Sequence, residues 1–232
     1  MDRVDRADRH PAQPADVDAI VAHLPLRTVR MPRTPYTLTV KPILDRVAAI
    51  LAIALAAIPM LLIAGAVALL LGRPVLFRQR RVGQHGTSFE VLKFRTMRPD
   101  RRGQRLAVIH DRRRTHKTPL DPRHTAFGQF LRRYSLDELP QLFNVLRGEM
   151  SFVGPRPELH AVVDEQYQPG LEQRHHVKPG LTGLWQISAR SDGPMHENGE
   201  WDLAYVEQVS AWTDLRILLR TPAAMFLRER GA

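Results

Sequence analysis

The sequence predicts an α+β protein, mostly helical, in which an N-terminal membrane helix and a small β-hairpin precede a helical domain. Three observations support this class. The chain has 232 residues, 44% of them apolar and 25% charged, which is enough to bury the core of one domain. Residues 47–71 contain no charged side chain. Two β-prone segments follow this run, and much of the remaining chain shows helical periodicity.

Composition excludes several functional classes. The chain has no cysteine, which rules out disulfides, thiolate metal sites and a cysteine nucleophile. Its mean hydropathy is −0.28, too low for a protein with many membrane spans. Its formal net charge of +10 favours an acidic partner, such as nucleic acid, a nucleotide or an anionic membrane surface.

The first 40 residues are rich in proline, arginine and aspartate and show little apolar periodicity. Such a composition cannot bury enough apolar surface to offset the conformational entropy that folding removes. We therefore expect residues 1–40 to form a disordered tail.

The apolar run over residues 47–71 predicts a membrane helix. A straight helix of this length would extend about 37 Å, against a bilayer core of about 30 Å. Pro59 lies at the centre of the run, and proline bends a helix because it removes a hydrogen bond. Each half would be only about 18 Å long, which reaches the middle of a bilayer.

Both flanks of this run are basic, and basic flanks tend to remain on the cytoplasmic side. The flanking cations are Arg30, Arg33, Lys41 and Arg46 before the run and Arg73, Arg78, Arg80 and Arg81 after it. A re-entrant helix over residues 41–72, which enters and leaves on the same face, agrees with this tendency. A kinked helix that spans the bilayer remains equally open.

The part of the chain after the membrane helix begins with a predicted β-hairpin, whose strands cover residues 74–80 and 88–94. Residues 99–122 are polar and basic and predict an exposed loop with a short helix. Residues 154–157 predict a rigid turn and residues 179–183 a loop. Helices are expected at residues 125–133, 136–146, 159–167, 171–176, 201–209 and 214–227.

Positive charge is concentrated in residues 72–133, which hold 17 Lys or Arg against 4 Asp or Glu. Such a segment beside a membrane helix suits anionic lipid headgroups and phosphorylated ligands. No nucleic-acid-binding motif accompanies it, so we expect no nucleic-acid partner. A solvated basic face is the alternative.

Residues 135–141 carry the most specific signal. Ser135 with Glu138 three residues later predicts a capping box at the start of a helix. A carboxylate among basic groups, such as Asp137, can attack phosphorus while a second carboxylate holds Mg²⁺. Ordinary acidic residues of a first helical turn are the alternative. Asp137 lies off the buried face that the following apolar residues predict, namely Leu136, Leu139, Phe143 and Leu146.

Residues 135–157, SLDELPQLFNVLRGEMSFVGPRP, resemble the signature of the bacterial sugar transferases, which are monotopic polyprenyl-phosphate phosphoglycosyl transferases. Further blocks are similar to those of the family and occur in the same order, at residues 80–83, 93–97, 121–123, 179–186 and 202–206. The resemblance extends over residues 41–225.

The resemblance implies an enzyme that initiates exopolysaccharide, O-antigen or glycoprotein glycan assembly. Asp137 would attack the β-phosphate of a UDP-sugar, UMP would leave, and polyprenyl (undecaprenyl) phosphate would then accept the sugar phosphate. Glu138 would bind Mg²⁺. Residues 73–232 would form the catalytic domain on the cytoplasmic face of the inner membrane, with residues 41–72 held in the lipid bilayer.

The resemblance also implies substrate-binding residues. Lys93 and Arg132 match positions that hold phosphates, and Arg156, fixed between Pro155 and Pro157, would meet the nucleotide. The other positions that the resemblance assigns to substrate binding are Arg95, Arg133, Gln141, Asn144, Pro155 and Pro157.

Ile58 and Pro59 mark the break in the membrane helix. The family's helix also breaks at proline, usually with a preceding serine whose hydroxyl can satisfy a freed carbonyl. Ile58 stands at that position in this chain.

Two other functions remain open from the residues alone. One is a membrane-tethered glycosyltransferase that moves only the sugar and releases UDP. The other is a non-enzymatic basic protein that binds acidic partners at the membrane. The residues do not identify the sugar, the glycan pathway or the oligomeric state.

Overall fold

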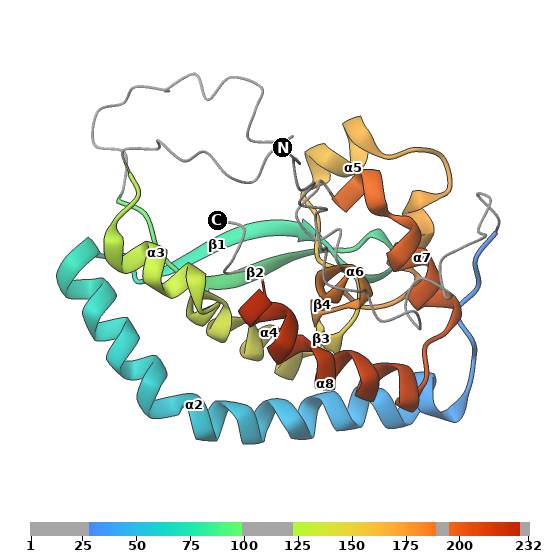
Figure 1. Cartoon of the computed structure of the whole chain (residues 1–232), viewed down its shortest axis with the longest axis horizontal. Helices are drawn as coiled ribbons and strands as arrows, with labels where there is room; N and C mark the ends of the chain where they lie inside the picture. The colour runs from blue at the N-terminus through green and yellow to red at the C-terminus, as the bar shows by residue number, and fades with distance from the viewer. Residues whose placement is uncertain (1–27, 99–122, 189–194, 228–232) are drawn as a thin grey trace, which may run out of the picture.

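The computed structural model describes residues 28–98, 123–188 and 195–227. The predicted tail over residues 1–27 and the predicted basic loop over residues 99–122 lie outside the described residues. Helices dominate the fold, together with two small two-stranded sheets (Figure 1). The predicted α+β, mostly helical class is therefore confirmed.

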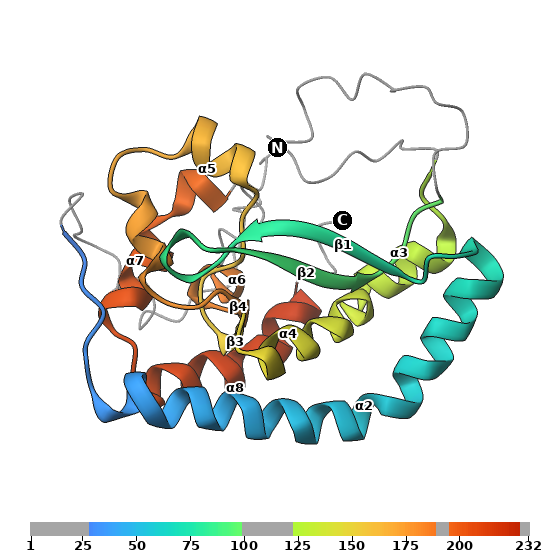
Figure 2. The same cartoon turned by 180° about the vertical axis from the view of Figure 1, so that it is seen from behind.

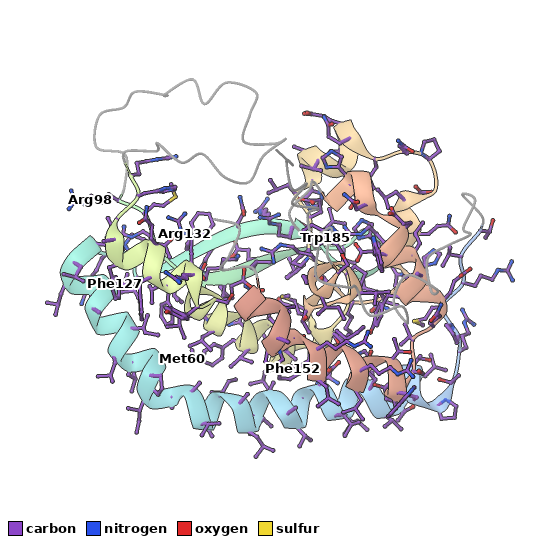
Figure 3. The ribbon with its side chains drawn as sticks, viewed as in Figure 1. Met60, Arg98, Phe127, Arg132, Phe152 and Trp185 are labelled. Atoms are coloured by element: carbon purple, nitrogen blue, oxygen red, sulfur yellow. The ribbon has the colours of Figure 1, made fainter. Side chains whose placement is uncertain are left out.

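A long apolar helix runs along one side of the domain. A π-helical turn, η1 (Tyr36–Val40), continues directly into α2 (Lys41–Leu71), and Figure 1 shows α2 bent near its middle. Pro59 lies inside the helix, and Met60 is labelled beside the bend in Figure 3. The bend has a local cause, because proline lacks the N–H that the helix needs and its ring crowds the preceding turn.

Helix α2, with its preceding turn, is the one helix among the described residues that is long and apolar enough to cross a membrane. Only 11% of the most apolar 18-residue stretch of this helix is buried by the rest of the protein. Leu55 and Leu69 are almost fully exposed, and Ile58 is also exposed. Since soluble domains seldom expose so much contiguous apolar surface, this face of α2 fits a lipid environment.

Two clusters of buried side chains attach the two halves of α2 to the domain. In the first half, Ala49 packs against the hairpin and against Val145 and Met150. In the second half, Val67 and Leu71 belong to a separate cluster that is completed by Phe94 and Leu131. Both halves of the bent helix are therefore held by the same domain.

Residues 28–40 belong to the fold, so the predicted disordered tail of residues 1–40 extends too far. Val29 is buried in the main core, and its N–H donates to Gln173 Oε1 at 2.5 Å. The Tyr36 hydroxyl donates to Asp214 Oδ2 at 2.6 Å. Isolated tertiary contacts such as these order a proline-rich segment without leaving any periodic signal in its sequence.

The predicted hairpin is confirmed. Strand β1 (Leu76–Val82) pairs antiparallel with β2 (Ser88–Phe94), and the short turn η2 (Gln84–Gly86) joins them, as Figure 2 shows from behind. Phe89, Val91 and Phe94 of β2 are buried in the clusters that hold α2. This packing fixes the end of β2 that carries Lys93 and leads directly into Arg95.

Most predicted helices are also found, with shifted ends. Helix α3 (Ala126–Arg133) begins at Thr125, whose side chain accepts the Gly128 N–H at 3.0 Å. The other predicted helices correspond to α5 (His160–Gln166), η4 (Leu171–His176), α7 (Glu200–Glu207) and α8 (Ala211–Leu227). Two short helices were not predicted, α6 (Leu184–Ile187) and η5 (Met195–Asn198).

The predicted loop over residues 179–183 instead contains a strand. Strand β4 (Gly180–Thr182) pairs parallel with β3 (Ser151–Val153). The two backbones meet at glycines, because a Cβ built on Gly180 would collide with the backbone nitrogen of Gly154. Three-residue strands joined across almost thirty positions have too little length for periodicity to reveal them.

The main core lies at the end of the domain away from the bend in α2. Trp185, labelled in Figure 3, packs there with Trp201, Tyr205 and Ile217. This core supports β3 and the turn that follows it, and that turn contributes a residue to the site described next.

Candidate active site

Asp137 and Glu138 lie on a 3₁₀ helix, η3 (Leu136–Gln141), which continues into α4 (Leu142–Arg147). The predicted capping box is wrong. Ser135 adopts a left-handed conformation with φ 53°, and its side chain makes no capping hydrogen bond. The Ser135 N–H donates to the Arg132 carbonyl at 3.1 Å and not to Glu138, whose carboxylate instead contacts Lys93 of the hairpin.

The predicted buried face of this segment is found only in part, because Leu136, Leu139 and Leu146 do pack partly buried against the core clusters. Phe143 is exposed, whereas Asp137, Gln141 and Asn144 are buried. The predicted face assumed 3.6 residues per turn, but side chains three apart eclipse one another in a 3₁₀ helix, so its buried positions differ. Asp137 therefore faces the interior, where burial can alter its chemistry.

Glu138 is held by two cations from separate elements. Lys93 Nζ of β2 lies 2.5 Å from Glu138 Oε1. Arg156 Nη2, from the turn after β3, lies 3.3 Å from the same oxygen. Burial alone would raise the pKa of Glu138, but the positive charges of Lys93 and Arg156 outweigh it and lower the pKa to about 2. Glu138 is therefore ionised throughout the physiological range.

Asp137 has a different environment, although it is the adjacent residue. It is 8% exposed, and within the described part of the chain no cation lies at ion-pair distance from its carboxylate. Burial raises the pKa of Asp137 to about 6, against the opposing charge of Lys93. Asp137 is thus largely ionised at neutral pH, yet poorly solvated, which suits a carboxylate nucleophile.

These pKa values predict a pH dependence of activity. If ionised Asp137 is the nucleophile, kcat/KM falls as the pH drops through about 6 and Asp137 becomes protonated. The charge of Lys93 lowers the pKa of Asp137, so Lys93→Met should move this acid limb to higher pH. Lys93→Arg keeps the charge and serves as the control. pH–rate profiles of the three proteins test this, and a limb that stays in place in Lys93→Met would contradict it.

Two predicted substrate-binding residues, Arg132 and Arg133, lie in the last turn of α3. Arg132 Nη1 lies 3.2 Å from His124 Nε2, and Figure 3 labels Arg132 on α3. Arg133 is exposed and lies over the ring of Tyr134. Helix α3 packs on η3 through Phe127 and Leu131, and binding of substrate by the two arginines stays a prediction.

Two other predicted substrate-binding residues, Arg95 and Asn144, make structural contacts. The Arg95 guanidinium donates to the carbonyls of Leu71, Gly72 and Arg73 and so caps the C-terminal end of α2. Asn144 accepts the Leu92 N–H at 3.1 Å and donates to the Glu90 carbonyl at 2.7 Å, which joins α4 to β2. The structure therefore does not bring Arg95 or Asn144 to the acidic pair.

Gln141 is the remaining predicted residue of this segment. It is buried, and its Nε2 has no hydrogen-bond partner within the described structure. Its part in substrate binding stays a prediction.

A set of buried charged residues behind the turn of Arg156 was not predicted from the sequence. Arg174 of η4 pairs with Asp202 of α7 at 2.6 Å, with both side chains 1% exposed. Arg81 of β1 pairs with Glu158 at 3.4 Å. Arg81 and Asp202 lie in blocks that resemble the family, but that resemblance gave them no role. Arg174 had no signal beyond an isolated arginine in a short helix.

The carboxylates suit magnesium. No group of three or more His, Asp or Glu side chains forms a metal cage among the described residues. Mg²⁺ rarely needs such a cage, because it is commonly bound by one or two carboxylates together with substrate phosphates and water. The cations contact only Oε1 of Glu138 in the described structure, which leaves Oε2 for a metal.

The site therefore combines an ionised carboxylate held by two cations with a poorly solvated carboxylate, on a domain packed along an apolar helix that suggests a membrane-associated protein. The family comparison is specific. The model of the bacterial sugar transferase family matches residues 36–228, and the chain belongs to this family. The predicted family is therefore confirmed.

Several named relatives are similar to the chain. The UDP-glucose:undecaprenyl-phosphate glucose-1-phosphate transferase of Xanthomonas campestris pv. campestris is 40% identical over 219 residues, which are 90% of this chain and 43% of that protein. The exopolysaccharide production protein ExoY of Sinorhizobium fredii is 41% identical over 81% of this chain and 85% of its own length. The undecaprenyl-phosphate galactose phosphotransferase of Salmonella typhimurium is 40% identical over 69% of this chain and 35% of its own length. The chain thus spans less than half of two of these relatives.

Proposed function

We propose that the protein transfers a sugar 1-phosphate from a UDP-sugar to polyprenyl phosphate in two steps. In the first, an Asp137 oxygen attacks the β-phosphorus, and the bond from this phosphorus to the bridging oxygen breaks. UMP leaves with that oxygen, and the sugar phosphate remains on Asp137. In the second, an oxygen of polyprenyl phosphate attacks the same phosphorus, and the Asp137 carboxylate leaves.

The contrast between the two adjacent carboxylates carries this proposal. A nucleophile must be ionised and free of strong ion pairs, as Asp137 is within the described structure. Glu138 is committed to Lys93 and Arg156, which can also neutralise phosphate charge as the nucleotide leaves. The relatives named for undecaprenyl-phosphate sugar transfer support the substrate classes.

We also propose Mg²⁺ as the cofactor, with Glu138 as its protein ligand. Glu138 would hold the ion, which would supply positive charge where negative charge develops on the departing UMP. Lys93 and Arg156, which contact Glu138, would add further positive charge for the phosphates.

The nucleotide released tests the proposed reaction against its alternatives. The purified protein is incubated with undecaprenyl phosphate, magnesium and UDP-glucose or UDP-galactose. We expect UMP together with a diphosphate-linked lipid. Release of UDP would show transfer of the sugar alone, and absence of turnover with every UDP-sugar would favour a binding protein.

We propose that α2 is re-entrant and that the domain lies on the cytoplasmic face of the inner membrane. The contacts at the two ends of α2 support this topology. At the N-terminal end of the helix, Tyr36 and Lys41 both bind Asp214 of α8. At its C-terminal end, Arg95, which directly follows β2, donates to the Leu71 carbonyl. One folded domain cannot bind both ends across a bilayer, and arginines on both flanks favour the cytoplasmic side.

Cysteine labelling tests this topology, because the chain has no cysteine of its own. Single cysteines replace Thr39 and Arg78, which are exposed on either side of the apolar run. With a membrane-impermeant thiol reagent, we expect both sites to be protected in intact cells and both to be labelled in inverted vesicles. Labelling of only one site in intact cells would show a spanning helix and contradict the proposal.

A further inference from the structure

The turn that carries Arg156 is held almost entirely by its carbonyl oxygens. Pro155 and Pro157 have no N–H, so the turn can be fixed to neighbouring elements only through acceptors and through Arg156 itself. The Pro155 carbonyl accepts the Gly180 N–H of β4 at 2.9 Å. The Pro157 carbonyl accepts from Arg81 Nη1 of β1 at 3.3 Å.

The middle carbonyl of this turn is held from the interior. Arg174 Nη2 donates to the Arg156 carbonyl at 2.7 Å. The same guanidinium donates from Nε and Nη2 to Asp202 Oδ2, at 2.9 and 2.6 Å, and from Nη1 to the Tyr167 hydroxyl at 2.5 Å. Arg174 therefore joins η4, α7 and the Arg156 turn through one planar group.

This arrangement places a buried side chain behind a half-exposed one. Arg174 is 1% exposed and cannot reach a substrate, whereas the Arg156 side chain is 39% exposed and contacts Glu138. A buried ion pair costs desolvation free energy, so its presence is weak support for a role in stability alone. Its position directly behind the turn indicates a role in placing Arg156.

We propose that Arg174, oriented by Asp202, is a positioning residue that sets the Arg156 guanidinium against Glu138 and the bound nucleotide diphosphate. The proposal rests on the proposed function, in which Arg156 meets the nucleotide. Arg174 and Asp202 would then affect binding of the UDP-sugar indirectly, through the position of Arg156, without contacting the UDP-sugar themselves.

The choice of arginine has a geometric reason. A guanidinium offers five N–H donors in a fixed plane, which allows it to hold a carboxylate, a hydroxyl and a carbonyl together. The lysine ammonium keeps the charge that Asp202 needs but is a single donor centre on a flexible stem. Arg174→Lys should therefore keep the ion pair with Asp202 and lose the hydrogen bond to the Arg156 carbonyl.

A double-mutant cycle on the full chain tests the proposal. Loss of a hydrogen bond to a charged group corresponds to about tenfold or more in affinity, so we expect Arg174→Lys to raise KM for the UDP-sugar about tenfold. Its kcat should change much less. Arg156→Ala should raise KM at least as far, and the double variant should be no worse than Arg156→Ala alone. Arg147→Lys makes the same replacement at an exposed site outside the network and should leave KM unchanged.

Effects on KM that add in the double variant would overturn the proposal, because Arg174 would then act independently of Arg156. An unchanged KM in Arg156→Ala would also overturn it, because Arg174 would have nothing to act through. If Arg174→Lys fails to fold by thermal melting, Asp202→Asn replaces it in the same cycle, with a smaller expected rise in KM.

The proposal and the proposed function can fail separately. The cycle compares KM values for the UDP-sugar, so its outcome does not depend on which nucleotide is released. Release of UDP by the wild-type protein would contradict the reaction proposed above but leave this result standing.

Discussion

Asp137→Asn is expected to abolish sugar-phosphate transfer and to leave the fold intact. The amide has nearly the same shape as the carboxylate but is a far poorer nucleophile, so we expect kcat to fall by at least about 10³-fold. The melting temperature should stay the same or rise. Burial raises the pKa of Asp137, which means that the folded protein disfavours its ionised form, and asparagine removes that penalty at neutral pH.

The measurement pairs turnover with thermal melting for Asp137→Asn and for a matched control. Asp164→Asn makes the same chemical change at an exposed position of α5 and should keep wild-type activity. Retention of more than a few per cent of wild-type kcat in Asp137→Asn would exclude this residue as the nucleophile.

Glu138→Gln should also lower the activity strongly, but it should lower the melting temperature, in contrast to Asp137→Asn. The glutamine cannot balance the charges of Lys93 and Arg156, and it is a poor Mg²⁺ ligand. We expect kcat to fall about 10²-fold or more and the magnesium concentration needed for half-maximal activity to rise. Because the Glu138 and Arg156 side chains are partly exposed, solvent screening limits the loss of stability to about 1–2 kcal/mol.

Opposite shifts in melting temperature for two adjacent carboxylates are the signature of this arrangement. The low pKa of Glu138 means that its ionised form stabilises the folded protein above its unfolded pKa, and this contribution is lost as the pH falls toward about 2. Magnesium titrations and melting curves of the two variants measure both effects. An unchanged magnesium requirement in Glu138→Gln would place the metal ligand elsewhere.

The sequence was most informative where signals are local or where the resemblance is long. The hairpin, the apolar helix with Pro59 and the Asp137–Glu138 pair were all predicted, because each depends on neighbouring residues. Arg156 was predicted from the resemblance, and the structure does bring it to Glu138.

The predictions failed where tertiary contacts determine the backbone. The sequence predicts that the Ser135 side chain caps a helix, but Ser135 instead adopts a left-handed conformation between α3 and η3. The pairing of β3 with β4 depends on the close approach of Gly154 and Gly180. The contact of Arg174 with the Arg156 turn joins residues 18 positions apart and leaves no spacing pattern. Arg95 was expected to bind substrate, and its capping of α2 becomes apparent only in the fold.

The central claim is that Asp137 carries the sugar phosphate between the two steps, and the mass of the intact protein tests it most directly. The protein is incubated with magnesium and a UDP-sugar that supports turnover, without polyprenyl phosphate. We expect a mass increase of one phosphosugar on the wild-type protein, none on Asp137→Asn, and its disappearance when undecaprenyl phosphate is added. An adduct that persists on Asp137→Asn, or an adduct that undecaprenyl phosphate does not remove, would contradict the account.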